Sequence, residues 1–141
     1  MTAVMISLLA WLGANTNYAI PQSERELPRI EYRTLAELQT IHGFAGRDVW
    51  ATYNHRKNTV YLRTPFHADD PVYRSVLLHE LVHFLQATNG KLSVCRGYRE
   101  AEAYALEFRW LQERGFTQPL HDPFMVKMLE ANCSFPADGS D

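Results

Sequence analysis

The segment between Asp70 and Gly90 constrains the fold of this chain more than any other. Asp70-Pro71 is a strong helix start, because an aspartate accepts hydrogen bonds from unpaired backbone N–H groups and proline suits the first helical position. The helix should run to about Thr88 and end at Asn89-Gly90. Its central residues are almost all apolar: Val76, Leu77, Leu78, Leu81, Val82, Phe84 and Leu85. We therefore predict a helix that is buried on nearly every side, so that other elements must pack around it.

Near its centre this helix contains the run His79-Glu80-Leu81-Val82-His83, an H-E-x-x-H motif. Positions i and i+4 lie one turn apart on the same face of a helix, so the two imidazoles can bind one Zn²⁺ ion. Glu80 is rotated by about 100° from His79. In enzymes with this motif, that rotation places the carboxylate beside the water that the metal activates, not on the metal. The sequence therefore predicts two zinc ligands, His79 and His83, and one catalytic base, Glu80.

A zinc site needs at least a third protein ligand, and the next predicted helix, residues 97–114, offers three glutamates. Glu100 lies 17 residues after His83, which leaves enough chain for a helix that returns antiparallel. Small residues on it permit a close approach of the helices: Ala101, Ala103 and Ala105. Glu102 points about 200° away from Glu100, toward an expected solvated face, and Glu107 lies two turns further along. We predict Glu100 as the third ligand, with Glu102 and Glu107 as its competitors.

The pairing of H-E-x-x-H with a later E-x-x-A resembles the gluzincin zinc peptidases. In that family the third ligand is a glutamate on the next helix with a small residue three positions later, which Glu100 and Ala103 match. The family usually has Asp or Asn one position further, where it orients a zinc-bound histidine, whereas this chain has Tyr104. The stretch from the predicted hairpin to Trp110 also resembles a family of small bacterial zincin-like domains. The resemblance implies a zinc-dependent metallopeptidase, in which Glu80 passes a proton from the attacking water to the leaving amine.

Three segments predict short strands, because apolar and β-branched residues alternate with polar ones in residues 29–33, 49–53 and 59–63. The last two flank a polar turn, His55 to Asn58, of hairpin length. In zincins an edge strand runs beside the active-site cleft and pairs with an extended peptide substrate. The strand over residues 59–63 directly precedes the motif helix, so it is the candidate for that edge.

The other segments predict three further helices. Residues 3–15 are apolar enough for a buried first helix, and Asp122-Pro123 starts a last one that ends near Ala131. Thr34 and Glu37 have the spacing of a capping box at the start of a short helix, which should end near residues 43–46. Helices and strands in separate blocks indicate an α+β fold. We expect one zincin-like domain over residues 1–141, with a small sheet packed on a helical core.

Composition and charge narrow the class of partner. The chain is 46% hydrophobic and 21% charged, as in ordinary globular proteins, and its net charge of −2 offers no general electrostatic attraction to nucleic acid. Its longest apolar run, residues 3–12, is too short to span a bilayer. We therefore expect a peptide or protein substrate, without nucleic acid or a membrane span. A short domain leaves substrate selection to the cleft walls or to a regulatory protein partner.

Two features bear on the compartment. Residues 1–19 contain an apolar core like that of a signal peptide, but no Lys or Arg precedes it, and Asn17 would occupy a poor cleavage position. We therefore predict a buried helix, which favours a cytoplasmic location but leaves the compartment open. Cys95 and Cys133 are either free thiols or one disulfide. A disulfide, or a signal peptide, would indicate a secreted or periplasmic protein instead.

Some polar side chains have no certain role. An oxyanion in the cleft needs a hydrogen-bond donor, and four residues are chemically suitable: Tyr98, Arg99, Tyr104 and His121. The isolated histidines, His42, His55 and His67, are expected on the surface or in turns. The tryptophans are expected in the core: Trp11, Trp50 and Trp110.

The alternative function is a zinc-stabilised binding or regulatory module with little or no peptidase activity.

Overall fold

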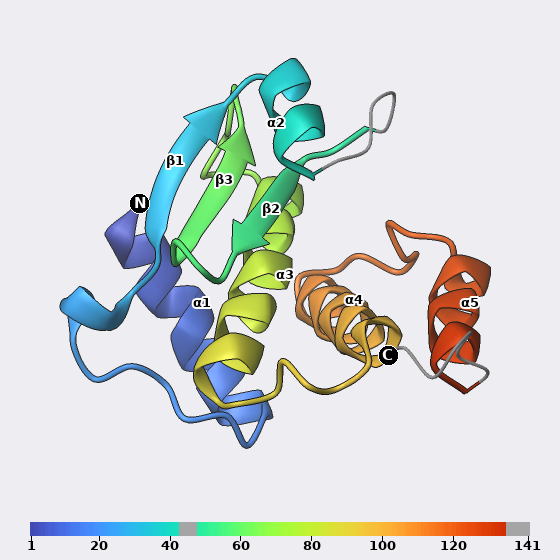
Figure 1. Cartoon of the computed structure of the whole chain (residues 1–141). Coiled ribbons are helices and arrows are strands. Elements are labelled where there is room, and N and C mark those ends of the chain that lie inside the picture. Colours follow the sequence, from blue (N-terminus) through green and yellow to red (C-terminus); the bar gives the residue numbers. More distant parts are fainter. Residues whose placement is uncertain (43–47, 135–141) are drawn as a thin grey trace.

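The computed structural model describes residues 1–42 and 48–134. Over those residues the chain is an α+β domain with five α-helices and one three-stranded mixed sheet (Figure 1). The helices are α1 (Thr2–Asn15), α2 (Leu35–His42), α3 (Pro71–Thr88), α4 (Arg96–Gln112) and α5 (Pro123–Ser134), with a 3-10 turn, η1 (Glu24–Glu26). The strands are β1 (Arg29–Arg33), β2 (Ala51–Asn54) and β3 (Thr59–Arg63). The predicted fold class and the predicted helices are confirmed.

Helix α3 is the buried centre of the domain, with α1 on one side and the sheet on another (Figure 1). The Asp70 side chain accepts a hydrogen bond from the Val72 N–H at 2.8 Å, and Pro71 occupies the first turn. Gly90 follows the C-cap with a φ of +73°, a conformation that favours glycine. In α3, Val76 is partly buried and six apolar residues are completely buried: Leu77, Leu78, Leu81, Val82, Phe84 and Leu85. Both predicted ends of this helix are therefore confirmed.

The sheet corrects the predicted edge strand. The strand order is β1-β3-β2, so β3 is central, paired in parallel with β1 and antiparallel with β2. The expectation that residues 59–63 form the edge is wrong, because β1 returns from earlier in the chain and fills the other side of β3. Strand β2 is an edge of the sheet instead, and it packs against α3 (Figure 1). It begins at Ala51, two residues later than predicted.

Local capping signals are confirmed where the structure describes them. Thr34 and Glu37 form the reciprocal capping box: the Thr34 N–H donates to Glu37 Oε1 at 3.0 Å, and the Glu37 N–H donates to Thr34 Oγ1 at 3.2 Å. The predicted helix end near residues 43–46 lies outside the described residues. At the start of α5, the Phe124 N–H donates to Asp122 Oδ1 at 2.9 Å, as an N-cap aspartate should accept it.

The two terminal helices attach to the core differently. Helix α1 buries Met5, Leu8, Leu9 and Leu12 in the cluster that contains α3, which confirms the predicted packing. Helix α5 packs on α4, and a disulfide between Cys95 and Cys133 joins the two. The structure thus contains the bridge rather than two free thiols. No helix in the described parts of the chain has the length and hydrophobicity to cross a membrane.

One tryptophan departs from the expected core placement. Trp110 is buried, whereas Trp50 is 42% exposed. The Trp50 ring packs edge-on against Tyr73, and the Arg63 guanidinium lies 4.9 Å from the ring centroid. Trp50 directly precedes edge strand β2, so its side chain lies at the rim of the domain and not between α3 and the sheet.

The cap of α3 can be tested separately from any activity. We expect Asp70→Ala to lower the free energy of unfolding by about 1 kcal/mol, because it removes the acceptor of the Val72 N–H. The matched control is Asp69→Ala, an exposed neighbour outside the helix, which should change stability by less than about 0.5 kcal/mol. Urea denaturation followed by circular dichroism measures both. Equal losses for the two variants would contradict the capping role.

Candidate metal centre

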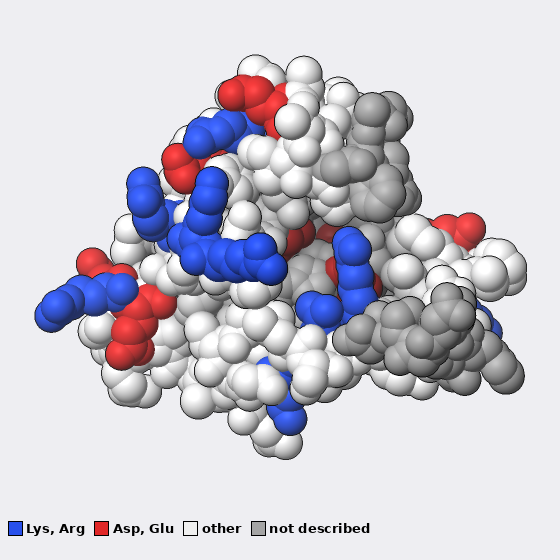
Figure 2. All heavy atoms as spheres, viewed as in Figure 1, with Lys and Arg blue, Asp and Glu red and all other residues white. Residues whose placement is uncertain are grey.

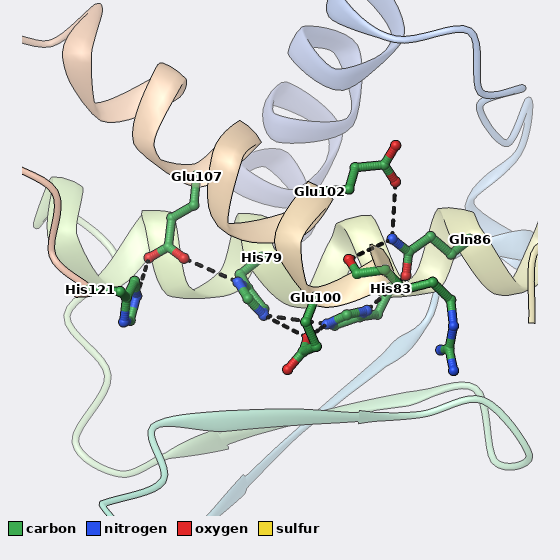
Figure 3. Close-up of polar contacts among 8 residues, drawn as sticks. His79, His83, Gln86, Glu100, Glu102, Glu107 and His121 are labelled. Atoms are coloured by element: carbon green, nitrogen blue, oxygen red, sulfur yellow. Dashed lines mark hydrogen bonds and ion pairs between the residues drawn. The ribbon is translucent and has the colours of Figure 1, made fainter. Parts of the chain in front are cut away.

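Helices α3 and α4 bring three of the predicted ligands to one point (Figure 3). His79 Nε2 lies 3.3 Å from His83 Nε2 and 3.2 Å from Glu100 Oε1. The third pair, His83 Nε2 and Glu100 Oε1, is also in contact. The sequence placed the histidines one turn apart on α3, and α4 returns antiparallel so that Glu100 meets both.

Two of these three pairs have the spacing of a tetrahedral metal site, whereas the His83–Glu100 pair is closer. Zinc bonds of about 2.0–2.1 Å at tetrahedral angles place ligand atoms about 3.3–3.4 Å apart, close to the 3.2 Å and 3.3 Å found here. Two imidazole nitrogens and one carboxylate oxygen are also a donor set that zinc accepts in catalytic sites. The residues present therefore fit a Zn²⁺ ion with one coordination position left open.

The expectation that Glu107 lies far from the metal site is wrong, because its carboxylate contacts His79. Glu107 is 2% exposed, and its Oε1 lies 3.1 Å from His79 Nδ1, the ring nitrogen that faces away from the other ligands (Figure 3). Its Oε2 lies 3.3 Å from both Ser75 Oγ and His121 Nε2. Glu107 thus orients His79, the task that the resemblance assigned to the position of Tyr104. A buried acid among apolar neighbours on α4 was the signal that could have identified it.

Gln86 orients His83 in the same way that Glu107 orients His79. No motif in the sequence indicated this role for Gln86. Its Oε1 lies 2.8 Å from His83 Nδ1, and its Nε2 donates to Arg99 O and to Glu102 Oε1, both at 2.9 Å. Because both amide hydrogens have acceptors, the amide oxygen must face His83, and His83 Nδ1 must carry the hydrogen. The Nε2 lone pair of His83 is then directed at the candidate metal position.

Glu102 is neither a ligand nor a solvated surface residue. It is half-buried and accepts hydrogen bonds from Gln86 and from the Tyr18 hydroxyl. Of the three glutamates considered, Glu100 is the one that lies within reach of both histidines. Glu102 instead fixes the amide of Gln86, and Tyr18 connects this network to the segment that follows α1.

Glu80 is buried beside the candidate ligands and lines the same cleft, without joining their cluster. Burial raises the pKa of its carboxyl, and the neighbouring His79 and His83 partly oppose this rise. A carboxylate with a raised pKa is a stronger base than an ordinary one, so it can accept a proton from water more readily. The predicted separation of roles between Glu80 and the two histidines is consistent with this placement.

The cleft around these residues has a volume of about 960 Å³. Of the four candidate oxyanion donors, Arg99, Tyr104 and His121 line it, whereas Tyr98 does not and is 44% exposed. The Tyr104 ring centroid lies 4.5 Å from that of His79 and from that of His121.

The expected placement of the isolated histidines is confirmed for two of them: His55 is exposed in the turn after β2, and His67 is exposed. His42 is half-buried at the end of α2, and both His42 and His55 line the cleft. His67 packs against Tyr73, with ring centroids 5.1 Å apart.

Without a metal, the same groups form a buried ion-pair network. Burial disfavours a charged imidazole, but hydrogen bonds with Glu100 and Glu107 outweigh it and raise the pKa of His79 to about 10. Burial would raise the pKa of Glu100, but hydrogen bonds from His79 and His83 lower it. The arrangement therefore attracts positive charge, whether protons or a metal ion.

The family described as Domain of unknown function (DUF6647) matches residues 1–137, so the chain belongs to it. The match spans every residue of the candidate metal centre. No curated protein and no solved structure matches the chain.

The raised pKa of His79 predicts a pH dependence of stability in the metal-free protein. A folded-state pKa of about 10 against an ordinary 6.5 means that the stabilisation is complete below pH 6.5 and is lost as the pH rises toward 10. With chelator present, we expect the free energy of unfolding to decrease over this range more steeply in wild type than in His79→Gln. Urea denaturation at several pH values measures it. Parallel pH profiles would contradict the ion-pair network.

Proposed function

We propose that this family member is a zinc-dependent metallopeptidase, with His79, His83 and Glu100 as the zinc ligands and Glu80 as the general base. One observation carries the proposal: three donor atoms from His79, His83 and Glu100 converge at one point, while Glu107 and Gln86 hold the outer nitrogens of both histidines. Metal-binding histidines usually have such acceptors on the outer nitrogen. The H-E-x-x-H helix followed by a glutamate helix and flanked by a small sheet also supports a zincin-like fold.

Zinc in this site would polarise the substrate carbonyl and acidify a water molecule. Glu80 then accepts a proton from the attacking water as the new C–O bond forms. It returns that proton to the amide nitrogen as the C–N bond breaks, so Glu80 ends the reaction ionised, as it began. Tyr104 and His121 line the cleft where they are candidates to donate a hydrogen bond to the developing oxyanion.

Strand β2 supplies the surface on which we expect the peptide to lie. Its residues Ala51, Thr52 and Tyr53 line the cleft, and its outer edge has no strand partner among the described residues. An extended peptide can pair with such an edge through backbone hydrogen bonds, without a requirement for particular side chains. We therefore propose β2, and not residues 59–63, as the edge strand that pairs with the peptide substrate.

Zinc content tests the ligands. We expect one zinc ion per chain, and Glu100→Ala should remove most of it, because two histidines alone leave an incomplete site. Glu107→Ala keeps all three ligands and should weaken zinc binding by only about 10- to 100-fold. Glu102→Ala, which acts through Gln86, should weaken it less than Glu100→Ala. Elemental analysis after dialysis against a competing chelator measures the series, and a zinc-free wild type would refute the proposal.

Hydrolysis tests the role of Glu80. We expect Glu80→Gln to lower the rate of peptide cleavage by about 10²- to 10⁴-fold, because glutamine has nearly the same shape but cannot accept and return a proton. Mass spectrometry of a peptide library measures cleavage, and unchanged zinc content and circular dichroism are the controls. A zinc-loaded wild type that cleaves no peptide would favour the binding-module alternative. A fully active Glu80→Gln would assign the base to another group.

A further inference from the structure

The two ends of the cleft can be told apart by their position along α3. Helix α4 is antiparallel to α3: Arg99 O accepts from Gln86 near the C-terminal end of α3, whereas Glu107 contacts Ser75 near its N-terminal end. Figure 3 shows the same order along α3, with His121 and Glu107 at one side of His79 and Gln86 at the other. The cleft therefore has one end near the C-terminus of α3 and another near its N-terminus.

Strand β2 runs along α3 in the same direction. Trp50 packs against Tyr73 in the first turn of α3, and Tyr53 packs against Phe84 about three turns further on. The hairpin turn that begins at His55 follows β2, so it lies at the C-terminal end of α3. The orientations of α4 and of β2 along α3 therefore place the start of α4 and the turn after β2 at the same end of the cleft.

The end near the C-terminus of α3 is basic. Arg96 and Arg99, from the first turns of α4, line the cleft together with His55 from the opposite wall. Arg96 precedes Glu100 by four residues, so it lies one turn away on the same face of α4, at about 5–6 Å between Cβ atoms. Within residues 1–42 and 48–134, no carboxylate forms an ion pair with either arginine. Figure 2 shows acidic atoms on the floor of this hollow and basic atoms at its rim.

The opposite end has a different chemistry. Trp50, Tyr104 and His121 line it, and the acid there, Asp48, is held by Arg63 at 2.6 Å. The basic side chains at this end already contact carboxylates, Arg63 with Asp48 and His121 with Glu107, so they are less available to an acidic substrate side chain. Among the described residues, the basic groups most available to a substrate are therefore those near the C-terminus of α3.

We propose that the cleft selects peptides with an acidic side chain on one side of the scissile bond, bound by Arg96 and Arg99. This proposal rests on the proposed peptidase function. An extended peptide advances about 3.3 Å per residue, so one helical turn between Arg96 and the ligand Glu100 places the acidic residue within about three positions of the cleaved bond. Guanidinium groups bind carboxylates through paired, charge-assisted hydrogen bonds.

Matched peptides test the selection. We use two sets of fluorogenic peptides that differ only in Glu or Gln at each position within three residues of the scissile bond. Wild type should cleave the Glu peptides with a kcat/KM about 5- to 30-fold higher on one side of the bond. Arg96→Gln/Arg99→Gln should lose this preference, and Arg96→Lys/Arg99→Lys should recover part of it. Equal cleavage of Glu and Gln peptides by wild type would overturn the proposal.

The controls separate specificity from activity and from folding. Arg109→Gln changes another exposed arginine on α4 that is paired with Glu113 and lies outside the cleft, so the preference should persist. Arg96 is exposed and has no hydrogen-bond partner among the described residues, so the single Arg96→Gln variant tests the idea if the double variant does not fold. Loss of preference in Arg109→Gln would refute an assignment to Arg96 and Arg99.

Binding to the zinc-loaded Glu80→Gln variant gives a readout that does not need cleavage. Fluorescence anisotropy should show tighter binding of the Glu peptide than of the Gln peptide, with a difference that shrinks at high salt. Cleavage without an acidic preference would leave the peptidase proposal standing and overturn this one. Acidic binding by a wild type that cleaves nothing would overturn the peptidase proposal and leave the recognition of acidic peptides standing.

Discussion

Two histidines on a largely apolar, mostly buried helix are the constraint from which the rest of the structure follows. Each ring has two nitrogens that need partners away from water, so α3 and the elements around it must supply four polar contacts. Helix α4 supplies Glu100 to both inner nitrogens and Glu107 to the outer nitrogen of His79. The outer nitrogen of His83 is satisfied within α3 by Gln86. The register of α4 against α3 is therefore set by hydrogen bonds as well as by packing.

One face of α4 combines these tasks. Arg96, Glu100, Tyr104 and Glu107 are spaced four, four and three residues apart, which is the spacing of one helical stripe. Along that stripe the chemistry changes from a basic group, to a candidate ligand, to an aromatic ring that packs on His79, and to a buried acceptor. Alanines beside the stripe, Ala101 and Ala103, are buried and allow α4 to approach α3 closely.

The features that the sequence predicted correctly are those encoded locally. The cap at Asp70, the capping box at Thr34 and the spacing of His79 and His83 each depend on residues a few positions apart. The order of the strands was not predictable in this way, because pairing between β1 and β3 depends on segments separated by α2 and the hairpin. The roles of Gln86 and Glu107 also depend on how α3 and α4 align, which helix periodicity alone does not specify. Cysteine spacing likewise left the disulfide open until the packing of α5 on α4 was known.

The candidate centre is contained in a single helical hairpin. The three ligand candidates, the acceptors behind both histidines and Glu80 all lie between Ser75 and Glu107, in two consecutive helices joined by residues 89–95. Closing so short a connection costs little entropy compared with joining β1 to β3. An ion bound by this hairpin would stabilise contacts that are local in sequence and that can form early, before the slower long-range pairing of the sheet. Binding of a metal ion by this hairpin would therefore be linked to the order of folding events by the topology of the chain.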